Sequence, residues 1–423
     1  MKAILIQSAV LVFPSHPLHK QKIDLLIDEN GIIEEISQKI ERDTSTFEVI
    51  NGNGKYLMPG FLDLNANFGE PGLETKEDIV SGCKLAAHSG FTAIAIQPNT
   101  KPAIQSRAEV MLVLKEAQDN LVDIHPIGAI SKNRKGEELT EMYDMYTHGA
   151  LAFTDGNRSV QQAGLMSRAL LYSKGFGARI FSYAKDDSIA SGHMVNEGVM
   201  STYLGMKGNP NLSEAIMVSR DLFLAEYNNA PIHFSTISTK EAIELIRQAK
   251  SKGLPVTCDV SISHLYYNDS YIEEFDSLYK IDPPLRSEED RLALITGLKD
   301  GTIDAIVSQH TPHEIEYKQV EFQVASYGIA SMQTLLPLAL QLDLDLELLV
   351  EKLSINPRKV LGLPAIAFEK GSAANVVLLD TEEEWTFGPA TNQSKSKNNP
   401  LYGTAVKGKA VVVINNNKIV YNY

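Results

Sequence analysis

The sequence predicts a (β/α)8 TIM barrel joined to a small β domain that is built from both ends of the chain. Two observations predict this α/β fold. Strand-like runs alternate with helical patterns through the middle of the chain, and β-rich stretches flank that region on both sides. The strictly alternating order argues against an all-β or an all-α protein. We place the β domain at residues 1–56 and 366–423 and the barrel at residues 57–365.

The two ends of the chain carry short apolar runs separated by turn signals. Residues 22–27 lead into the turn Asp-Glu-Asn-Gly at 28–31, and residues 32–36 return from it as in a β-hairpin. The apolar stretch at the N-terminus is followed by no small-residue cleavage site, so a strand is favoured over a signal peptide. Near the other end, strands are predicted at 374–380, 405–414 and 418–423.

The middle of the chain supplies the eight strands that a barrel needs: 56–64, 92–96, 123–130, 150–153, 178–182, 231–235, 255–260 and 302–307. Helical stretches such as 75–89, 107–120 and 239–252 lie between them. The second possibility is an open doubly wound sheet, but its glycine-rich fingerprint is absent after the first strand. The loops at 187–214 and 314–326 are long enough to act as lids or partner contacts.

Composition excludes several classes of function. The net charge of −14, without a basic cluster, argues against a nucleic-acid or anionic-membrane partner. The chain has no run of 18 or more apolar residues, so no transmembrane helix is expected. Cys83 and Cys258 lie far apart in apolar segments, which is typical of buried free thiols in a reducing compartment. We therefore expect a cytoplasmic protein.

Candidate site residues are read at the ends of the strands, because barrel active sites are built there. Asn65 and Asn67 end the first strand, where alternation points both side chains the same way. Histidines in this pattern would predict zinc, but an amide oxygen is a weak zinc ligand. The other strand-end positions offer one carboxylate, and histidines only beside the last two strands: Asn99, Asp155, Tyr183, Thr236, His264, Gln309, His310 and His313.

The segment His-Thr-Pro-His at 310–313 is the most site-like local signal, although a loop in which one histidine binds backbone explains it equally well. The nucleophile-elbow, Walker A and HExxH motifs are all absent. Cys83 falls within a helical pattern, which makes it a poor candidate for a nucleophile.

Segments along essentially the whole chain resemble dihydroorotase of the amidohydrolase superfamily in order and spacing. They are PGFLD at 59–63, EPG at 70–72, PNT at 98–100, FTDG at 153–156, STKE at 238–241, PPLRSEEDR at 283–291, DGTID at 300–304, HTPH at 310–313 and SKSKN at 394–398. The resemblance implies a barrel with a small β domain. It also implies reversible cyclisation of carbamoyl aspartate to dihydroorotate, in pyrimidine biosynthesis, by zinc-bound hydroxide.

The sequence departs from the family pattern at the positions that carry the family's metal ligands, general base and substrate-binding arginine. The family's paired histidines after the first strand are Asn65 and Asn67, and its substrate-carboxylate arginine is Gly69. The histidines expected after the fifth and sixth strands are Tyr183 and Thr236. The catalytic aspartate is Gln309, the asparagine before Pro-Pro-Leu-Arg is Asp282, and only Asn99, Asp155 and His313 keep the family's residue types.

These losses predict a dihydroorotase-like protein without catalytic residues, bound metal or cofactor, since zinc ligands, base and substrate anchor are all replaced. The resemblance implies a role as a structural partner of aspartate transcarbamoylase, in a homo- or hetero-oligomer, because non-catalytic family members have that role. Two alternatives stay open. One is an active dihydroorotase with a relocated metal on Asp155, His264, His310 and His313, and the other is a metal-free barrel that binds a small molecule in a vestigial pocket.

Overall fold

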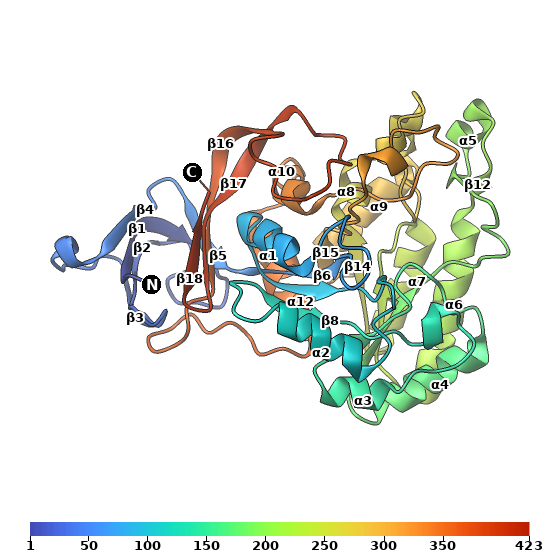
Figure 1. Ribbon diagram of the computed structural model, residues 1–423, viewed down its shortest axis with the longest axis horizontal. Helices are drawn as coiled ribbons and strands as arrows, with labels where there is room; N and C mark the ends of the chain where they lie inside the picture. The colour runs from blue at the N-terminus through green and yellow to red at the C-terminus, as the bar shows by residue number, and fades with distance from the viewer. Residues whose placement is uncertain (423) are drawn as a thin grey trace.

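The computed structural model describes residues 1–422 and consists of a β-sheet domain beside a barrel (Figure 1). The sheet is eight-stranded, with the order β18-β17-β16-β5-β1-β2-β3 and with β4 pairing β1. Its strands come from both ends of the chain, as predicted: β1 Ile4–Leu11, β2 Lys22–Ile27, β3 Ile33–Ser37, β4 Glu48–Asn51, β5 Tyr56–Pro59, β16 Val376–Phe387, β17 Thr404–Asn415 and β18 Lys418–Tyr421. Tyr423, in the predicted strand 418–423, lies outside the described residues.

The barrel is a ring of eight strands in which every pairing is parallel. The strands are β6 Phe61–Ala66, β7 Phe91–Ile96, β8 Asp123–Pro126, β9 Ala152–Phe153, β10 Arg179–Tyr183, β13 Ile232–Ser235, β14 Val256–Ser261 and β15 Ala305–Val307. Two single bridges close the ring, one between Gly128 and Phe153 and one between Ala66 and His310. This confirms the predicted barrel.

Helices cover the outside of the barrel. They are α1 Ile79–His88, α2 Arg107–Glu116, α3 Met142–Thr147, α4 Ala163–Lys174, α6 Asn211–Asn228, α7 Lys240–Ser251, α8 Ile262–Tyr266, α9 Glu288–Lys299, α10 Leu335–Ala339, α11 Leu346–Val350 and α12 Asn356–Leu361. The predicted helices within 75–89, 107–120 and 239–252 are present with shorter ends. Local sequence fixes where they begin: the side chains of Asp78, Ser106 and Thr239 accept hydrogen bonds from the first turns of α1, α2 and α7.

The segment 187–214, predicted as a long loop, contains short elements of its own. They are β11 Val195–Asn196, α5 Val199–Leu204 and β12 Gly208–Asn209, which lie at the end of the barrel farthest from the sheet domain (Figure 1). Short 3-10 turns occupy other connections, at Thr44–Thr46, Lys132–Arg134, Asp269–Ile272, Ser277–Tyr279, Ile315–Tyr317 and Met332–Thr334, and a π turn spans Glu351–Ile355.

The predicted single strand 56–64 is wrong, because it is two strands in two different sheets. β5 pairs with β1 and β16 of the sheet domain, whereas β6 begins the barrel. The chain passes from one to the other at Gly60, where a Cβ atom would lie 2.3 Å from side-chain atoms of Asn375 and Thr92. Only glycine fits this crossing, and the expected domain boundary after residue 56 therefore cuts through β5.

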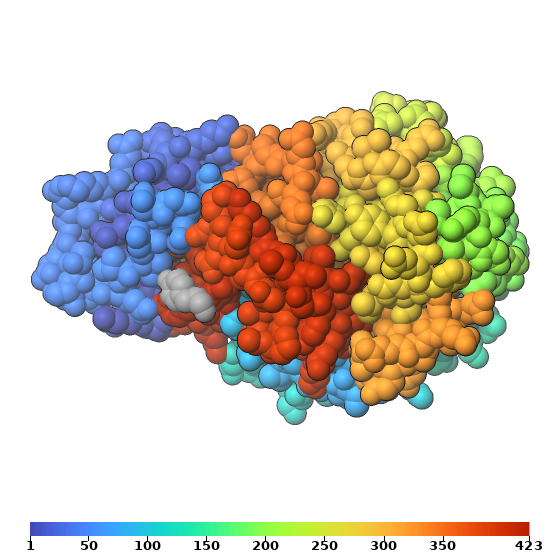
Figure 2. Space-filling view, turned by 90° about the horizontal axis from the view of Figure 1, so that it is seen from above, coloured from blue at the N-terminus to red at the C-terminus, as the bar shows by residue number. Residues whose placement is uncertain are grey.

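The two domains are tightly joined. Figure 2 shows the C-terminal part of the chain lying between the N-terminal strands and the barrel. Asn415 at the end of β17 donates hydrogen bonds to backbone carbonyls of Thr92 and Leu121 in the barrel. Cys83 and Cys258 are buried free thiols, as predicted. Among residues 1–422, no helix combines the length and apolar character needed to cross a lipid bilayer.

Candidate functional site at the barrel mouth

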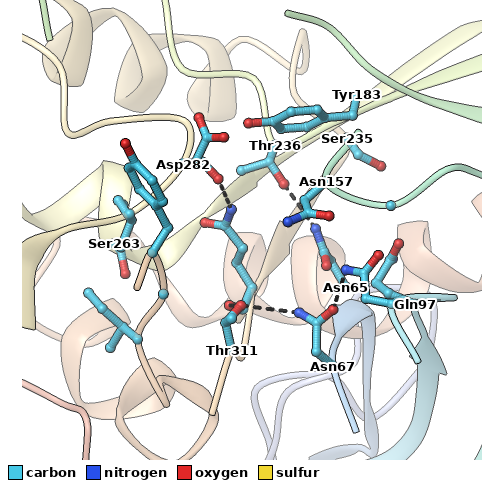
Figure 3. Close-up of a pocket in the computed structure, with 17 residues that line it drawn as sticks. Asn65, Asn67, Gln97, Asn157, Tyr183, Ser235, Thr236, Ser263, Asp282 and Thr311 are labelled. Atoms are coloured by element: carbon cyan, nitrogen blue, oxygen red, sulfur yellow. Dashed lines mark hydrogen bonds between the residues drawn. The ribbon is translucent and has the colours of Figure 1, made fainter. Parts of the chain in front are cut away.

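The carboxyl ends of the barrel strands surround a cavity of about 60 Å³ (Figure 3). Seven of the predicted site residues line it, namely Asn65, Asn67, Asn99, Tyr183, Thr236, Asp282 and Gln309. The prediction that both asparagines after the first strand face one point is confirmed, since Asn65 and Asn67 both line this cavity. The lining is dominated by carboxamides and hydroxyls, and it contains one carboxylate and no imidazole among the described residues.

The asparagines of the mouth are engaged with one another. The Asn65 amide donates to the Thr236 hydroxyl at 3.0 Å. Asn67 accepts from the Asn99 amide at 2.6 Å and donates to the backbone oxygen of His310 at 2.9 Å. The Asn99 oxygen in turn accepts from the guanidinium of Arg134. Asn67, Asn99 and Arg134 therefore form a connected polar network that fixes the orientations of both amides, while Asn65 is bonded separately to Thr236.

Two residues of the mouth hold a left-handed backbone. The φ angles of Thr236 and Gln309 are 55° and 53°, a region that β-branched residues such as threonine rarely adopt. Surrounding contacts hold them there. The Thr236 amide donates to Asp259 at 2.6 Å, and the Gln309 side chain donates to the Asp282 backbone oxygen at 2.9 Å. Backbone strain of this kind often accompanies a functional site.

The single carboxylate that the described residues place in the mouth, Asp282, is held by an ion pair with Lys185 and a contact with His193. Lys185 lies 2.7 Å from it and His193 lies 3.3 Å from it. Burial alone would raise the pKa of Asp282, but its hydrogen bonds and charge interactions with His193 and Lys185 lower this pKa well below the ordinary value. The neighbouring Tyr183 hydroxyl is driven the other way, because burial and the charge of Asp282 raise its pKa well above 10.0. Asp282 is thus an ionised structural group, and Tyr183 stays protonated.

Besides His264 and His310, three predicted site residues do not line the mouth cavity. Gly69 and His313 line an adjoining cavity. A Cβ atom on Gly69 would lie 2.1 Å from the backbone oxygen of Leu73, so this loop conformation excludes any larger residue there. Asp155 lines neither cavity. It is buried and accepts hydrogen bonds from the backbone and hydroxyl of Ser131, at 2.9 and 2.5 Å.

The SKSKN segment, residues 394–398, holds the His-Thr-Pro-His segment in place through hydrogen bonds. The buried Asn398 side chain accepts from the His313 backbone amide at 3.0 Å, and it donates to the carbonyls of Thr311 and Gly328 at 3.0 and 3.1 Å. The Ser394 hydroxyl donates to the buried carboxylate of Glu77. The SKSKN match thus corresponds to a structural brace that holds the mouth loops in place.

The residues of the mouth do not fit a zinc centre. Catalytic zinc takes three protein ligands, chiefly imidazole, thiolate or carboxylate, and no three such side chains converge anywhere within residues 1–422. The four candidates for a relocated metal do not converge within residues 1–422. His264 contacts the hydroxyl of Ser261 and the carbonyl of Pro283, Asp155 binds Ser131, and Nε2 of His313 faces a backbone oxygen. The Nε2 atom of His310 is buried without a hydrogen-bond partner and lies 3.7 Å from the carboxylate of Glu77.

Sequence reasoning missed several residues of the site. Lys185 and His193 hold Asp282, although neither stands at a strand end. Arg134 reaches the mouth from the turn after β8, and Gln97 and Asn157 are among the other residues that line the cavity. The position of Lys185, two residues after Tyr183, was an available signal, because it continues the alternation of β10. No sequence signal indicated Arg134, since its turn carries no periodic pattern.

Comparison with known proteins shows the family to which this chain is related. A family model described as "Dihydro-orotase-like" matches residues 54–242. A protein named dihydroorotase from Acetivibrio thermocellus is 41% identical over 404 residues, covering 94% of each chain. Another from Geobacter metallireducens is 38% identical over 423 residues, covering 99% of each. The chain belongs to the dihydroorotase family.

The dihydroorotase family is part of the amidohydrolase superfamily, and the fold agrees with solved structures from that superfamily. An L-hydantoinase (dihydropyrimidinase) from Arthrobacter aurescens superposes with a TM-score of 0.85 at 24% identity, covering 100% of this chain and 96% of the other. A dihydropyrimidinase from Brevibacillus agri superposes with a TM-score of 0.81 at 20% identity. At this identity the likeness concerns the fold alone. The dihydroorotase-family chain thus keeps the architecture while its barrel mouth carries amides and hydroxyls.

Proposed function

We propose that this dihydroorotase-family chain is catalytically inactive and serves pyrimidine biosynthesis as a structural partner of aspartate transcarbamoylase. One observation carries the proposal of inactivity: the mouth cavity is lined by carboxamides and hydroxyls, and its single carboxylate is Asp282. Dihydroorotase chemistry, as the resemblance implies it, needs a metal-bound hydroxide and a general base. The donor set of the mouth supports neither.

A general base is missing at the position where the resemblance expects one. Gln309 lines the cavity there, and its neutral amide cannot take a proton at neutral pH. Asp155 points to Ser131, and Asp282 is paired with Lys185. Loss of a general base alone typically costs roughly 10²–10⁴-fold in rate, and here the imidazole ligands are replaced as well.

An active dihydroorotase is the second candidate function. The observation that favours it is that full-length relatives at 37–41% identity are named dihydroorotase. The test is an assay of the isolated chain, purified with zinc present and without chelator, for ring closure of carbamoyl aspartate and ring opening of dihydroorotate. We expect turnover equal to a blank without protein. Zinc-dependent turnover above that blank would establish the second candidate in place of the first.

A surface suited to a protein partner lies on α6. Leu212, Ile216, Phe223 and Tyr227 of α6 follow helical spacing along one face and are all exposed. Phe223 is 70% exposed and Tyr227 is 85% exposed. We call these four residues the α6 apolar face.

The size of the α6 apolar face supports association. A large aromatic side chain buries about 150–250 Å², so the two exposed aromatics supply on the order of 400 Å². A specific complex buries about 800 Å² on each partner. The two aromatics thus account for about half of one side of a standard interface, and the face begins at Leu212, within the segment 187–214 expected to contact a partner.

Co-expression with aspartate transcarbamoylase from the same organism, followed by size-exclusion chromatography, tests the partnership. We expect co-elution of the wild-type chain and separate elution of the double variant Phe223→Glu/Tyr227→Glu. The matched control is Met111→Glu on α2, an exposed apolar residue outside the α6 apolar face. Separate elution of the wild-type chain, with unchanged transcarbamoylase activity, would remove the partnership. Self-association through this face without transcarbamoylase would also remove it.

A further inference from the structure

Three asparagines of the chain are each followed directly by a glycine, and all three are exposed to solvent. Such a pair can cyclise, because the backbone nitrogen of a glycine reaches the side-chain Cγ of the asparagine without hindrance from a Cβ atom. The attack needs a glycine N–H that makes no other hydrogen bond, and a backbone that is free to rotate. The pairs are Asn30-Gly31, Asn51-Gly52 and Asn53-Gly54.

The first two pairs are held by the surrounding structure. The Gly31 amide donates to the backbone oxygen of Asp28 at 3.1 Å, and the Gly52 amide donates to the backbone oxygen of Gln7 at 2.8 Å. Both glycines are buried, and a Cβ atom on Gly31 or Gly52 would lie 2.9 or 2.8 Å from neighbouring atoms. In these pairs the nitrogen can attack only after a backbone hydrogen bond breaks and the packing opens.

The third pair is open. Asn53 and Gly54 are exposed at the centre of a tight turn, which a backbone hydrogen bond of 2.9 Å from Lys55 closes. Gly54 has a φ of 77°, and a Cβ atom on it would have no neighbour within 4 Å. No described residue accepts a hydrogen bond from the Gly54 amide, so its nitrogen is available for attack.

A lysine contacts the oxygen on which charge develops during this attack. The Lys22 ammonium, at the start of β2, donates to Oδ1 of Asn53 at 3.2 Å. When the Gly54 nitrogen attacks Cγ, this oxygen takes up negative charge, and a nearby cation stabilises the transition state. The side-chain oxygen of Asn51 accepts from a neutral donor instead, the backbone amide of Asn53 at 3.0 Å. The charge of Lys22 therefore favours the same pair that the open turn favours.

We propose that the Asn53-Gly54 pair is a modification site, where Asn53 deamidates through a cyclic imide with assistance from Lys22. The Gly54 nitrogen forms a bond to Cγ and loses its proton, the Cγ–Nδ2 bond breaks, and ammonia leaves with that proton. Water then adds to one of the two imide carbonyls and opens the ring, which gives aspartate or isoaspartate. No group is oxidised or reduced, because one amide and one water become one carboxylate and one ammonium. The other two pairs react more slowly.

Deamidation at this turn changes the sheet domain. The new carboxylate stands where Lys22 now binds a neutral amide, so an exposed ion pair forms. The isoaspartyl product also adds one carbon to the main chain between β4 and β5, both of which pair with β1. The inference goes beyond the proposed function and does not depend on it, because neither the barrel mouth nor the α6 apolar face takes part.

Prolonged incubation of the folded full chain at mildly alkaline pH tests the inference. Isoaspartate is measured by methylation with a protein isoaspartyl methyltransferase and labelled S-adenosylmethionine, and peptide fragmentation in a mass spectrometer assigns its position. We expect conversion of Asn53 to be at least about tenfold faster than conversion of Asn30 or Asn51, because those two pairs must first break a backbone hydrogen bond. In urea, where the fold is lost, the three sites should convert at similar rates.

Variants separate the parts of the site. Asn53→Gln should abolish the fast conversion, whereas the control Asn30→Gln should leave it unchanged. Lys22→Met should slow the conversion about twofold to fivefold, which is the effect of one exposed charge contact. The matched control Lys2→Met, at another exposed lysine, should not slow it. All four positions are exposed, so the variants keep the fold, and circular dichroism verifies this.

Three results would overturn the inference. They are conversion of Asn30 or Asn51 as fast as Asn53 in the folded chain, the same preference for Asn53 in urea, and an unchanged folded chain after all three sites have converted in urea. An unchanged rate in Lys22→Met would overturn the assistance by Lys22. Zinc, turnover and transcarbamoylase play no part in this test.

Discussion

We predict that the barrel mouth cannot hold zinc, and introducing imidazoles there is the most direct test of this prediction. The double variant Asn65→His/Asn67→His restores the pair of histidines that the family pattern places after the first barrel strand. A catalytic zinc needs at least one further ligand, and among residues 1–422 the only carboxylate that lines the mouth is Asp282, which is paired with Lys185. We therefore expect this variant to gain no zinc and to lose stability.

The loss of stability follows from the hydrogen bonds that the two asparagines make. Asn67 donates to the His310 carbonyl and to the Thr311 hydroxyl, at 2.9 and 3.1 Å, and accepts from Asn99 at 2.6 Å. Asn65 makes one more bond across the mouth. At about 1 kcal/mol net for each hydrogen bond, the double variant should lose about 2–4 kcal/mol of its free energy of unfolding.

Zinc would reverse this loss if the mouth could bind it. A ligand at a hundred times its Kd stabilises the folded state by about 2.7 kcal/mol. The measurement is urea unfolding with and without added zinc, together with the zinc content after dialysis, and the control is Asn53→His on an exposed turn. Stoichiometric zinc in the double variant, with stabilisation of about 2.7 kcal/mol, would refute our reasoning about the donor set.

Three further predictions follow from the site. Asn398→Ala should lower the free energy of unfolding by about 3 kcal/mol, because three buried hydrogen bonds are lost at about 1 kcal/mol each, whereas the exposed control Asn53→Ala should stay within about 0.5 kcal/mol in the same urea titration. Burial lowers the pKa of His264 and of His313 from 6.5 to about 4. Between pH 6.5 and pH 4 the unfolded chain therefore binds more protons than the folded chain. The free energy of unfolding should fall as the pH is lowered through this range, by about 3 kcal/mol per histidine. In His264→Gln it should depend less steeply on pH. Gln309→Asp alone should produce no dihydroorotase turnover in the zinc-supplemented assay, because it restores a carboxylate without any metal ligand.

Much of the fold could be predicted from the sequence, because alternating strand and helix patterns over the middle of the chain leave few architectures available. The boundary between the two domains could not be predicted from the sequence. The apolar run from Tyr56 to Leu64 serves two sheets, and apolar content does not distinguish them. The crossing at Gly60 depends on the close approach of Asn375 and Thr92, which come from distant parts of the chain.

The sequence predicts the side chains of the mouth where the alternation of a strand fixes the direction in which they point, as at Asn65 and Asn67. Asp155 also follows a strand, but β9 has only two residues, and the carboxylate binds Ser131 in a neighbouring loop. Arg134 comes from an irregular turn, where no periodicity states which way a side chain points. Its contact with Asn99 is a property of the tertiary structure alone.

The sheet domain has a consequence for the order of events during synthesis. Its central strand β5 pairs on one side with β1 and on the other with β16, and β17 ends only at Asn415. The N-terminal strands leave the ribosome first, yet β5 has an unpaired apolar edge until every barrel strand has been made. The barrel can close earlier, so the sheet domain is completed last. Pairings so distant in sequence form slowly and leave strand edges open to wrong partners, and the nascent chain is most vulnerable to aggregation during that interval.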